Sequence, residues 1–168
     1  GCGLSVGVTT VFNSLSIGSF NAAPSRKQDR LQKLVDGIQD ARAEGMLKAD
    51  HRIHWRCETT SDYLPELIEG FSSHPMTSMF SMMDHTPGQR QYRNISQHME
   101  NWRANGMSQE DCDARLADYR ERQARNADRN REFVAKLAVS LGHPLASHDD
   151  EDVDQIDIAA DLGATVAE

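Results

Sequence analysis

Acidic and imidazole side chains stand where the predicted strands of this chain end. Glu58 closes one strand, Asp84 and His85 end the next, and His148 follows a third. The carboxyl ends of parallel strands meet at one edge of a sheet, where α/β proteins bind their ligands. Imidazole and carboxylate are suitable ligands for zinc, and for manganese or iron with less preference. The sequence therefore predicts a divalent metal site with Glu58, His85 and His148 at one rim.

Other residues at strand ends have simpler explanations as well. The first predicted strand ends in Asn13 and Ser14, and the last ends in Glu168. A single polar residue at a strand end is often a solvated loop residue, so the convergence of several favours a site. The segment TPGQRQ, residues 86–91, is by itself a turn around a Pro–Gly pair. The arginines between 115 and 131 are explained as partners of acids on exposed helix faces.

Strands and helices alternate along the chain. Predicted strands cover residues 7–15, 51–58, 76–84, 143–150 and 164–168, and predicted helices cover residues 26–45, 62–72, 90–104, 109–141 and 150–163. Such alternation is typical of an α/β fold with a parallel sheet. Two architectures fit, namely an open doubly wound sheet and five consecutive strands of a (β/α)₈ barrel. A whole barrel takes about 250 residues, so this chain would supply only part of one.

The strand at 51–58 indicates where a binding face would lie. Arg52, His54, Arg56 and Glu58 point to one side, whereas the alternate residues are mostly apolar. A polar strand face is usually solvated, but in a closed parallel barrel it can line the lumen and serve a site. Asp62 is predicted to cap the helix that follows.

Composition excludes several classes of protein. The chain has 168 residues, of which 38% are hydrophobic and 26% charged, so we expect one domain over residues 1–168. Its net charge of −8 argues against a nucleic-acid or anionic-membrane binder, and it has no apolar run long enough to cross a bilayer. Three cysteines without a CxxC pair favour a reducing compartment, and hence the cytoplasm. Both ends of the chain look like strands, so we expect it to be a piece of a longer protein.

Known catalytic motifs of other classes are missing from the sequence. It contains neither GxxxxGK[ST] nor GxSxG, and its glycine-rich start precedes a strand, whereas a dinucleotide-binding fingerprint follows one. No motif therefore supports a P-loop nucleotide-binding, dinucleotide-binding or serine-hydrolase function.

Four segments, in order, resemble one family. HRIHWRCE, MMDHTPGQRQ, LASHDD and GATVAE are similar to the phosphonate-metabolism branch of the amidohydrolase superfamily, the family of the α-D-ribose 1-methylphosphonate 5-triphosphate diphosphatases. The resemblance runs along nearly the whole chain, and the pair DHTPGQRQ and ASHDD is its most specific part. It implies the central part of an amidohydrolase (β/α)₈ TIM barrel, with about five parallel strands and flanking helices.

The resemblance also implies a reaction and roles for residues. The reaction cleaves a ribose 5-triphosphate that carries a phosphonate to the 5-monophosphate and pyrophosphate, with a divalent metal, in the first place zinc. Glu58, His85 and His148 fall on metal positions, and Gln89 and Arg90 fall in a loop facing the polyphosphate. Asn13 falls where the family often has an Asp, and we expect it to contact substrate. The family's first-strand metal motif and the final-strand Asp that orients water have no counterpart here, so we expect the chain alone to be a poor catalyst.

Two other functions remain open, and so does the quaternary structure. The chain could belong to an amidohydrolase acting on a cyclic amide or a nucleotide, or it could be a non-catalytic α/β binding module. A partial barrel leaves two open sheet edges, at the first and last strands, with unpaired backbone groups and apolar residues. We therefore predict a homodimer.

Overall fold

Five strands form one parallel sheet in the computed structural model, which describes residues 7–18 and 24–167. Their order across the sheet is their order in the sequence. The strands are β1 (Thr10–Ile17), β2 (Asp50–Glu58), β3 (Thr77–Met83), β4 (Leu145–Ser147) and β5 (Val166–Ala167). All four pairings are parallel, as the alternation of elements predicts.

Helices connect the strands. They are α2 (Pro24–Ala43), α3 (Leu64–Ser72), α4 (Ile95–Ala104), α5 (Gln109–Leu141) and α6 (Val153–Asp161), with a 3₁₀ turn η1 at Arg90–Tyr92. The predicted helix at 109–141 is confirmed with both of its ends. The Ser108 hydroxyl accepts from the Asp111 amide at 3.1 Å, and Gly142 ends the helix with a left-handed φ of 67°.

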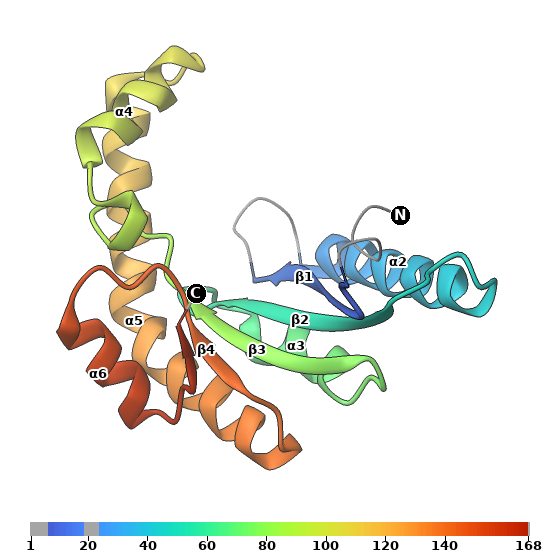
Figure 1. Cartoon of the computed structure of the whole chain (residues 1–168). Helices are drawn as coiled ribbons and strands as arrows, with labels where there is room; N and C mark the ends of the chain where they lie inside the picture. The colour runs from blue at the N-terminus through green and yellow to red at the C-terminus, as the bar shows by residue number, and fades with distance from the viewer. Residues whose placement is uncertain (1–6, 19–23, 168) are drawn as a thin grey trace.

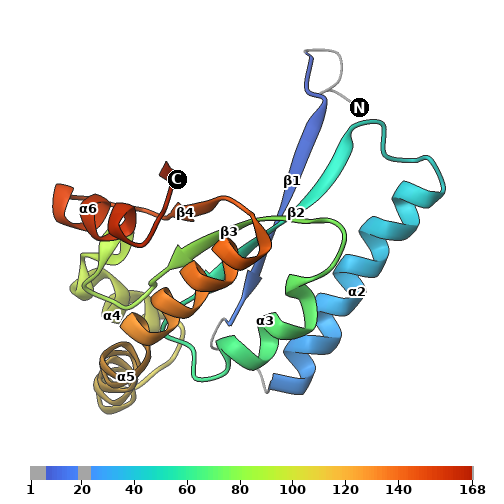
Figure 2. The ribbon, with the colours of Figure 1, turned by 90° about the horizontal axis from the view of Figure 1, so that it is seen from below.

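The sequential strand order separates the two architectures considered above. A doubly wound sheet reverses its strand order and places helices on both faces. Here the order runs from β1 to β5 without reversal, and Figures 1 and 2 show α2, α3 and α5 along the same face of the sheet. This arrangement is consistent with a segment of a (β/α)₈ barrel.

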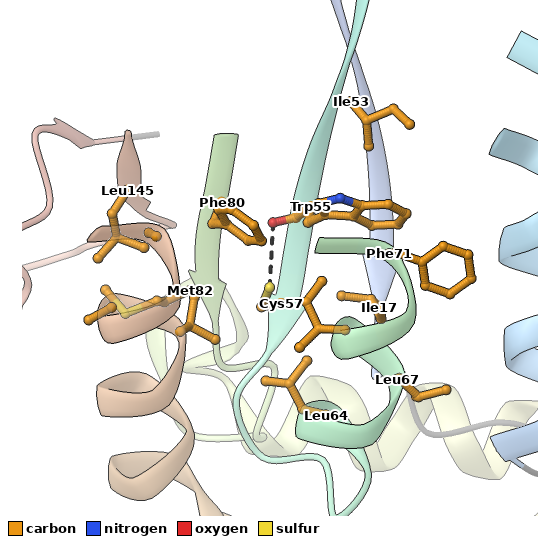
Figure 3. Packing of buried hydrophobic residues seen from close by; sticks show 14 of the residues in the cluster. Ile17, Ile53, Trp55, Cys57, Leu64, Leu67, Phe71, Phe80, Met82 and Leu145 are labelled. Carbon is orange, nitrogen blue, oxygen red and sulfur yellow. Dashed lines mark hydrogen bonds between the residues drawn. The ribbon is translucent and has the colours of Figure 1, made fainter. Parts of the chain in front are cut away.

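The core lies between the sheet and this helical layer. Figure 3 shows Leu64 and Phe71 of α3 packed toward Ile17, Trp55 and Cys57 of β1 and β2, and all five side chains are buried. The Trp55 indole lies 5.2 Å from the Phe71 ring, and its N–H donates to the Thr77 hydroxyl at 2.9 Å. The apolar side of the predicted β2 alternation is thus confirmed.

The opposite face of β2 is polar. His54 is buried on that face, with its ring nitrogens 3.2 Å from the Ser14 hydroxyl and 2.8 Å from the Ser81 hydroxyl. Arg56 and Glu58 follow on the same side of β2. The polar residues of β2 therefore extend in a row toward the carboxyl edge of the sheet.

Several element boundaries differ from the predictions. β1 continues to Ile17, because the alternation of small and apolar residues persists through Ser16. β4 is confined to three residues, and the predicted helix at 90–104 divides into η1 and α4, since Asn94 accepts from the Gln97 amide and starts a new helix. Asp62 does not cap α3, because its carboxylate is bound by Asn126 and Arg125 of α5. Glu168 lies outside the described residues.

The helix α4 packs on the first part of α5, and together they form an arm that rises away from the sheet (Figure 1). The arm starts at the loop that follows β3, so its base lies at the carboxyl edge. Among the described helices, none has the length and hydropathy needed to cross a bilayer.

Val134→Ala should lower the free energy of unfolding by about 2–3 kcal/mol, because Val134 is fully buried in the core on α5. Val139→Ala is the matched control on the same helix, where the side chain is 74% exposed, and we expect a change within about 0.5 kcal/mol. Urea denaturation of both variants tests the packing of α5. Equal losses for the two would contradict it.

Candidate metal and phosphate site

Three strand ends bring their polar residues to one rim, as the sequence predicts. β2 ends at Glu58, β3 is followed by Asp84 and His85, and β4 is followed by His148. The Glu58 Oε2 atom lies 2.5 Å from His85 Nδ1, and the rings of His85 and His148 are 6.2 Å apart between centroids. The structure therefore places Glu58, His85 and His148 together.

Three side chains at this rim can offer ligand atoms to one metal ion. One ligand atom each from His85, His148 and Asp149 lies within 4.8 Å of the others. The backbone of Asp149 is left-handed, with a φ of 55°, a conformation that Asp tolerates better than most residues. Asp149 was not among the residues predicted to bind the metal, although its position beside His148 in ASHDD was a usable signal.

Glu58 lies behind His85 in this arrangement. Its carboxylate is buried at 1% exposure and accepts from the Thr60 hydroxyl at 2.9 Å and the His85 backbone amide at 3.4 Å. Because His85 Nδ1 faces this carboxylate, Nε2 is the ring atom left for a metal. A carboxylate behind a ligating His fixes its tautomer and orientation. Direct ligation by Glu58 stays a prediction.

Arg56 reaches the same cluster from the polar face of β2. Its Nη2 atom lies 2.5 Å from His148 Nε2, and the Asp149 carboxylate lies 3.1 Å from the same nitrogen. The alternation along β2 predicts that Arg56 lies on the face that leads to the site, but it gives no signal for the contact with His148, which is 92 residues away.

Arg90, predicted to face the polyphosphate, ties two rim loops together. Its guanidinium donates to the His148 carbonyl oxygen and to the Asp150 carboxylate. The side chains of Arg90 and Asp150 are both largely buried. The backbone of Arg90 has a φ of 46°, unusual for a residue with a long side chain. Gln89, its predicted companion, is exposed on the same loop. The loop after β3 is therefore attached to the residues that flank His148.

Asn13 lies elsewhere. Since β1 continues to Ile17, Asn13 is in the middle of the strand, and the prediction that the strand ends there is wrong. Its amide donates to the Arg52 carbonyl oxygen at 2.9 Å and lies 3.3 Å from His51 Nδ1. Ser14, not Asn13, points to the face that carries His54.

Asp84, next to His85, is buried and fully engaged. It accepts from the Thr86 amide at 3.0 Å, from the Gln123 amide group at 2.7 Å and from the Arg131 guanidinium at 3.3 Å. Gln123 and Arg131 come from α5, so the long helix fixes the residue that precedes a candidate ligand.

The same helix holds the loop that follows Glu58. The buried amide of Asn130 donates to the carbonyl oxygens of Thr59 and Ser61, each at 2.8 Å. One turn earlier, Asn126 donates to the Thr60 carbonyl at 3.2 Å and to the Asp62 carboxylate at 2.8 Å. These two amides satisfy backbone groups that would otherwise be buried without partners.

A row of aromatic rings leads from the rim onto the arm. The Tyr92 ring meets the His85 ring edge-on at 5.2 Å, and His98 and Trp102 follow at 4.9 and 6.0 Å. Burial raises the pKa of the Tyr92 phenol, and the carboxylates of Asp149 and Glu58 add to this. The row therefore connects a candidate metal ligand to the arm through Tyr92 of η1, a residue that was not among the predicted site residues.

Comparison with known proteins identifies a relative that covers almost the whole chain. The alpha-D-ribose 1-methylphosphonate 5-triphosphate diphosphatase of Escherichia coli (strain K12) is 32% identical to the chain over 166 residues. The alignment includes 96% of the chain and 43% of that protein, so the chain spans less than half the length of this relative. The predicted resemblance is confirmed. No family model matches the chain, and no solved structure matches it significantly.

Asp62→Asn should weaken the pH dependence of stability in acid. Burial disfavours the charged form of Asp62, but the bonds from Asn126 and Arg125 outweigh it and hold its pKa below the usual 3.8. A lowered folded pKa gives stability that is complete above the unfolded value and is lost as pH falls through the folded one. The variant should therefore be less stable than the wild type at pH 6, and the difference should shrink as pH falls below 3.8 and through the folded pKa.

Urea denaturation between these pH values measures the effect. Asp118→Asn is the control, since it removes an exposed ion pair with Arg122 on the same helix and should change stability by less than about 0.5 kcal/mol. A constant difference between Asp62→Asn and the wild type across the acid range would contradict the assignment.

Proposed function

We propose that this chain, a relative of the diphosphatase of phosphonate metabolism along almost its whole length, carries part of the active site of a metal-dependent phosphohydrolase. The observation that supports this most is the meeting of His85, His148 and Asp149 at the rim, because these residues lie in the two segments most specific to the family. The sequential strand order and the one-sided helical layer support an amidohydrolase (β/α)₈ barrel as the fold.

The donor set fits a divalent metal. Two imidazoles and a carboxylate are typical zinc ligands, and manganese or iron is compatible with them. His85, His148 and Asp149 would hold the ion, with Glu58 orienting His85 through Nδ1 or joining the ligand set. Such an ion lowers the pKa of bound water to about 7 and neutralises charge on phosphoryl oxygens.

The proposed substrate is a ribose 1-phosphonate 5-triphosphate, from which water would release the 5-monophosphate and pyrophosphate. Transfer of a phosphoryl group depends mainly on positioning and charge neutralisation. Gln89 would donate to phosphate oxygens from its exposed position on the loop after β3. Arg90 would do so as well, because a guanidinium has five N–H donors and the two bonds to His148 and Asp150 leave some for an anion.

Asn13 is the weakest of the substrate residues predicted from the sequence. It lies in the middle of β1, on the side opposite Ser14. We therefore assign substrate contacts to the loop that carries Gln89 and Arg90. Because the chain spans less than half of its relative, hydrolysis is proposed for a site completed by elements that correspond to the rest of that protein.

The buried cysteines bear on the compartment of the protein, and the exposed outer strands bear on its assembly. Cys57 and Cys112 are buried free thiols, and burial raises the pKa of Cys57, so its thiol is unreactive. We propose a cytoplasmic location on this basis. For the chain taken by itself, we also propose a homodimer that covers the outer strands, where Phe12 of β1 and Val166 of β5 are more than 40% exposed.

In the full-length protein, His148→Ala should lower kcat for pyrophosphate release by more than about a hundredfold, because a metal ligand is lost. Phosphorus NMR of a ribose 1-methylphosphonate 5-triphosphate, with and without a chelator, follows the products directly. His143→Ala is the control, since His143 precedes β4 at the opposite edge of the sheet and contacts the Phe80 ring. Hydrolysis that survives both the chelator and His148→Ala would overturn the proposal.

A further inference from the structure

Arg56 is a partly buried arginine whose guanidinium lies where the positive charge of a metal ion would be expected. It lies on the polar face of β2, two residues before Glu58, and its guanidinium points to the cluster of His85, His148 and Asp149. Its Nη2 atom approaches a ring nitrogen that the proposed metal needs, beside the Asp149 carboxylate.

The chemistry of the contact fixes which group donates. A guanidinium carries only N–H donors, so His148 Nε2 must accept from Arg56 with its in-plane lone pair. Metal coordination uses the same lone pair of a neutral imidazole. One lone pair serves one partner, so the guanidinium and the metal exclude each other at Nε2.

The acidic surroundings of His148 Nε2 stabilise a positive charge there, whether it belongs to the Arg56 guanidinium or to a metal ion. The Asp149 carboxylate lies 3.1 Å from the same Nε2 atom, and the buried Glu58 carboxylate stands on the other side of His85. A positive group between these acids is stabilised by both of them. Arg56 would therefore supply that charge whenever the metal is absent.

We propose that Arg56 is an internal competitor of the metal ion: its guanidinium occupies His148 Nε2 in the metal-free protein and must leave for the ion to bind. This inference rests on the proposed function, because it takes His148 as a metal ligand. It makes Arg56 a positioning residue that keeps His148 oriented without metal and lowers the affinity for metal.

The test measures metal affinity in the full-length protein, whose site is complete, with Co²⁺ as the probe, by its visible absorption and by calorimetry. If Arg56 engages Nε2 in about nine molecules of ten, then Arg56→Gln should bind Co²⁺ about tenfold more tightly than the wild type. Arg56→Met, which has no donor, should show the same gain and guards against a folding defect of one variant. A residue that only supports the structure would give a loss of affinity on removal, not a gain.

Arg52→Gln is the matched control. Arg52 lies on the same strand and the same face, but it is half exposed and pairs with Asp50 at 2.8 Å, so its removal should leave Co²⁺ affinity unchanged. Adding His148→Ala to Arg56→Gln should abolish the gain, which locates the gain at this site.

The outcomes separate this inference from the function beneath it. Equal or weaker Co²⁺ binding by both Arg56 variants, with binding still lost in His148→Ala, overturns the competition and leaves the metal site intact. A tenfold gain in a protein that does not hydrolyse the triphosphate supports the competition and counts against the proposed reaction. Failure of wild type and variants alike to bind Co²⁺ overturns both.

Discussion

The burial of the Glu58 carboxylate is the constraint around which the rim is arranged. A carboxylate removed from water costs several kcal/mol unless hydrogen bonds replace its hydration. Glu58 is 1% exposed and receives these bonds from the Thr60 hydroxyl, the His85 amide and the His85 ring. Satisfying one acid therefore fixes both the loop after β2 and the first residue pair after β3, including the orientation of a candidate metal ligand.

The remaining rim residues keep that arrangement in place by joining segments far apart in the sequence. Asn130 of α5 binds the loop after Glu58, and Arg90 binds the residues after β4. Arg90 and Asp149 both have left-handed backbones, a conformation that costs about 1–3 kcal/mol and persists only where surrounding contacts impose it. Such strain on two sides of one cluster is typical of a binding or catalytic site, and here it coincides with His148.

Much of this arrangement follows from local sequence patterns. The alternation in β2, the Ser108 and Gly142 ends of α5 and the polar residues after each strand are short-range signals, and they predicted the parallel sheet, the long helix and the meeting of His85 with His148. The pairing of side chains across the rim depends on contacts between distant segments. The approach of Arg56 to His148 and the capture of Asp62 by α5 therefore had no local signal.

The error at Asn13 has the same physical origin. The first predicted strand was read as ending in Asn13 and Ser14, but β1 pairs with β2 through Ile17, so its end is set by a partner strand about 40 residues away in the sequence. Direct ligation by Glu58 stays a prediction, because a strand-end position does not show which of its oxygens would face a metal, and the ligand atoms within 4.8 Å of one another belong to His85, His148 and Asp149. A one-dimensional pattern gives the edge on which a residue lies but not which of its atoms faces a neighbour.

Nitrogen NMR of the His85 ring tests the central claim most directly, since it reports which nitrogen carries the proton. The account predicts an Nδ1–H tautomer, held by Glu58, and a large change of the Nε2 shift alone when Zn²⁺ is added. In Glu58→Gln, the ring proton of His85 should exchange between Nδ1 and Nε2, so that both tautomers are populated. An Nε2–H tautomer in the wild type, or an Nε2 shift that Zn²⁺ leaves unchanged, would contradict the account.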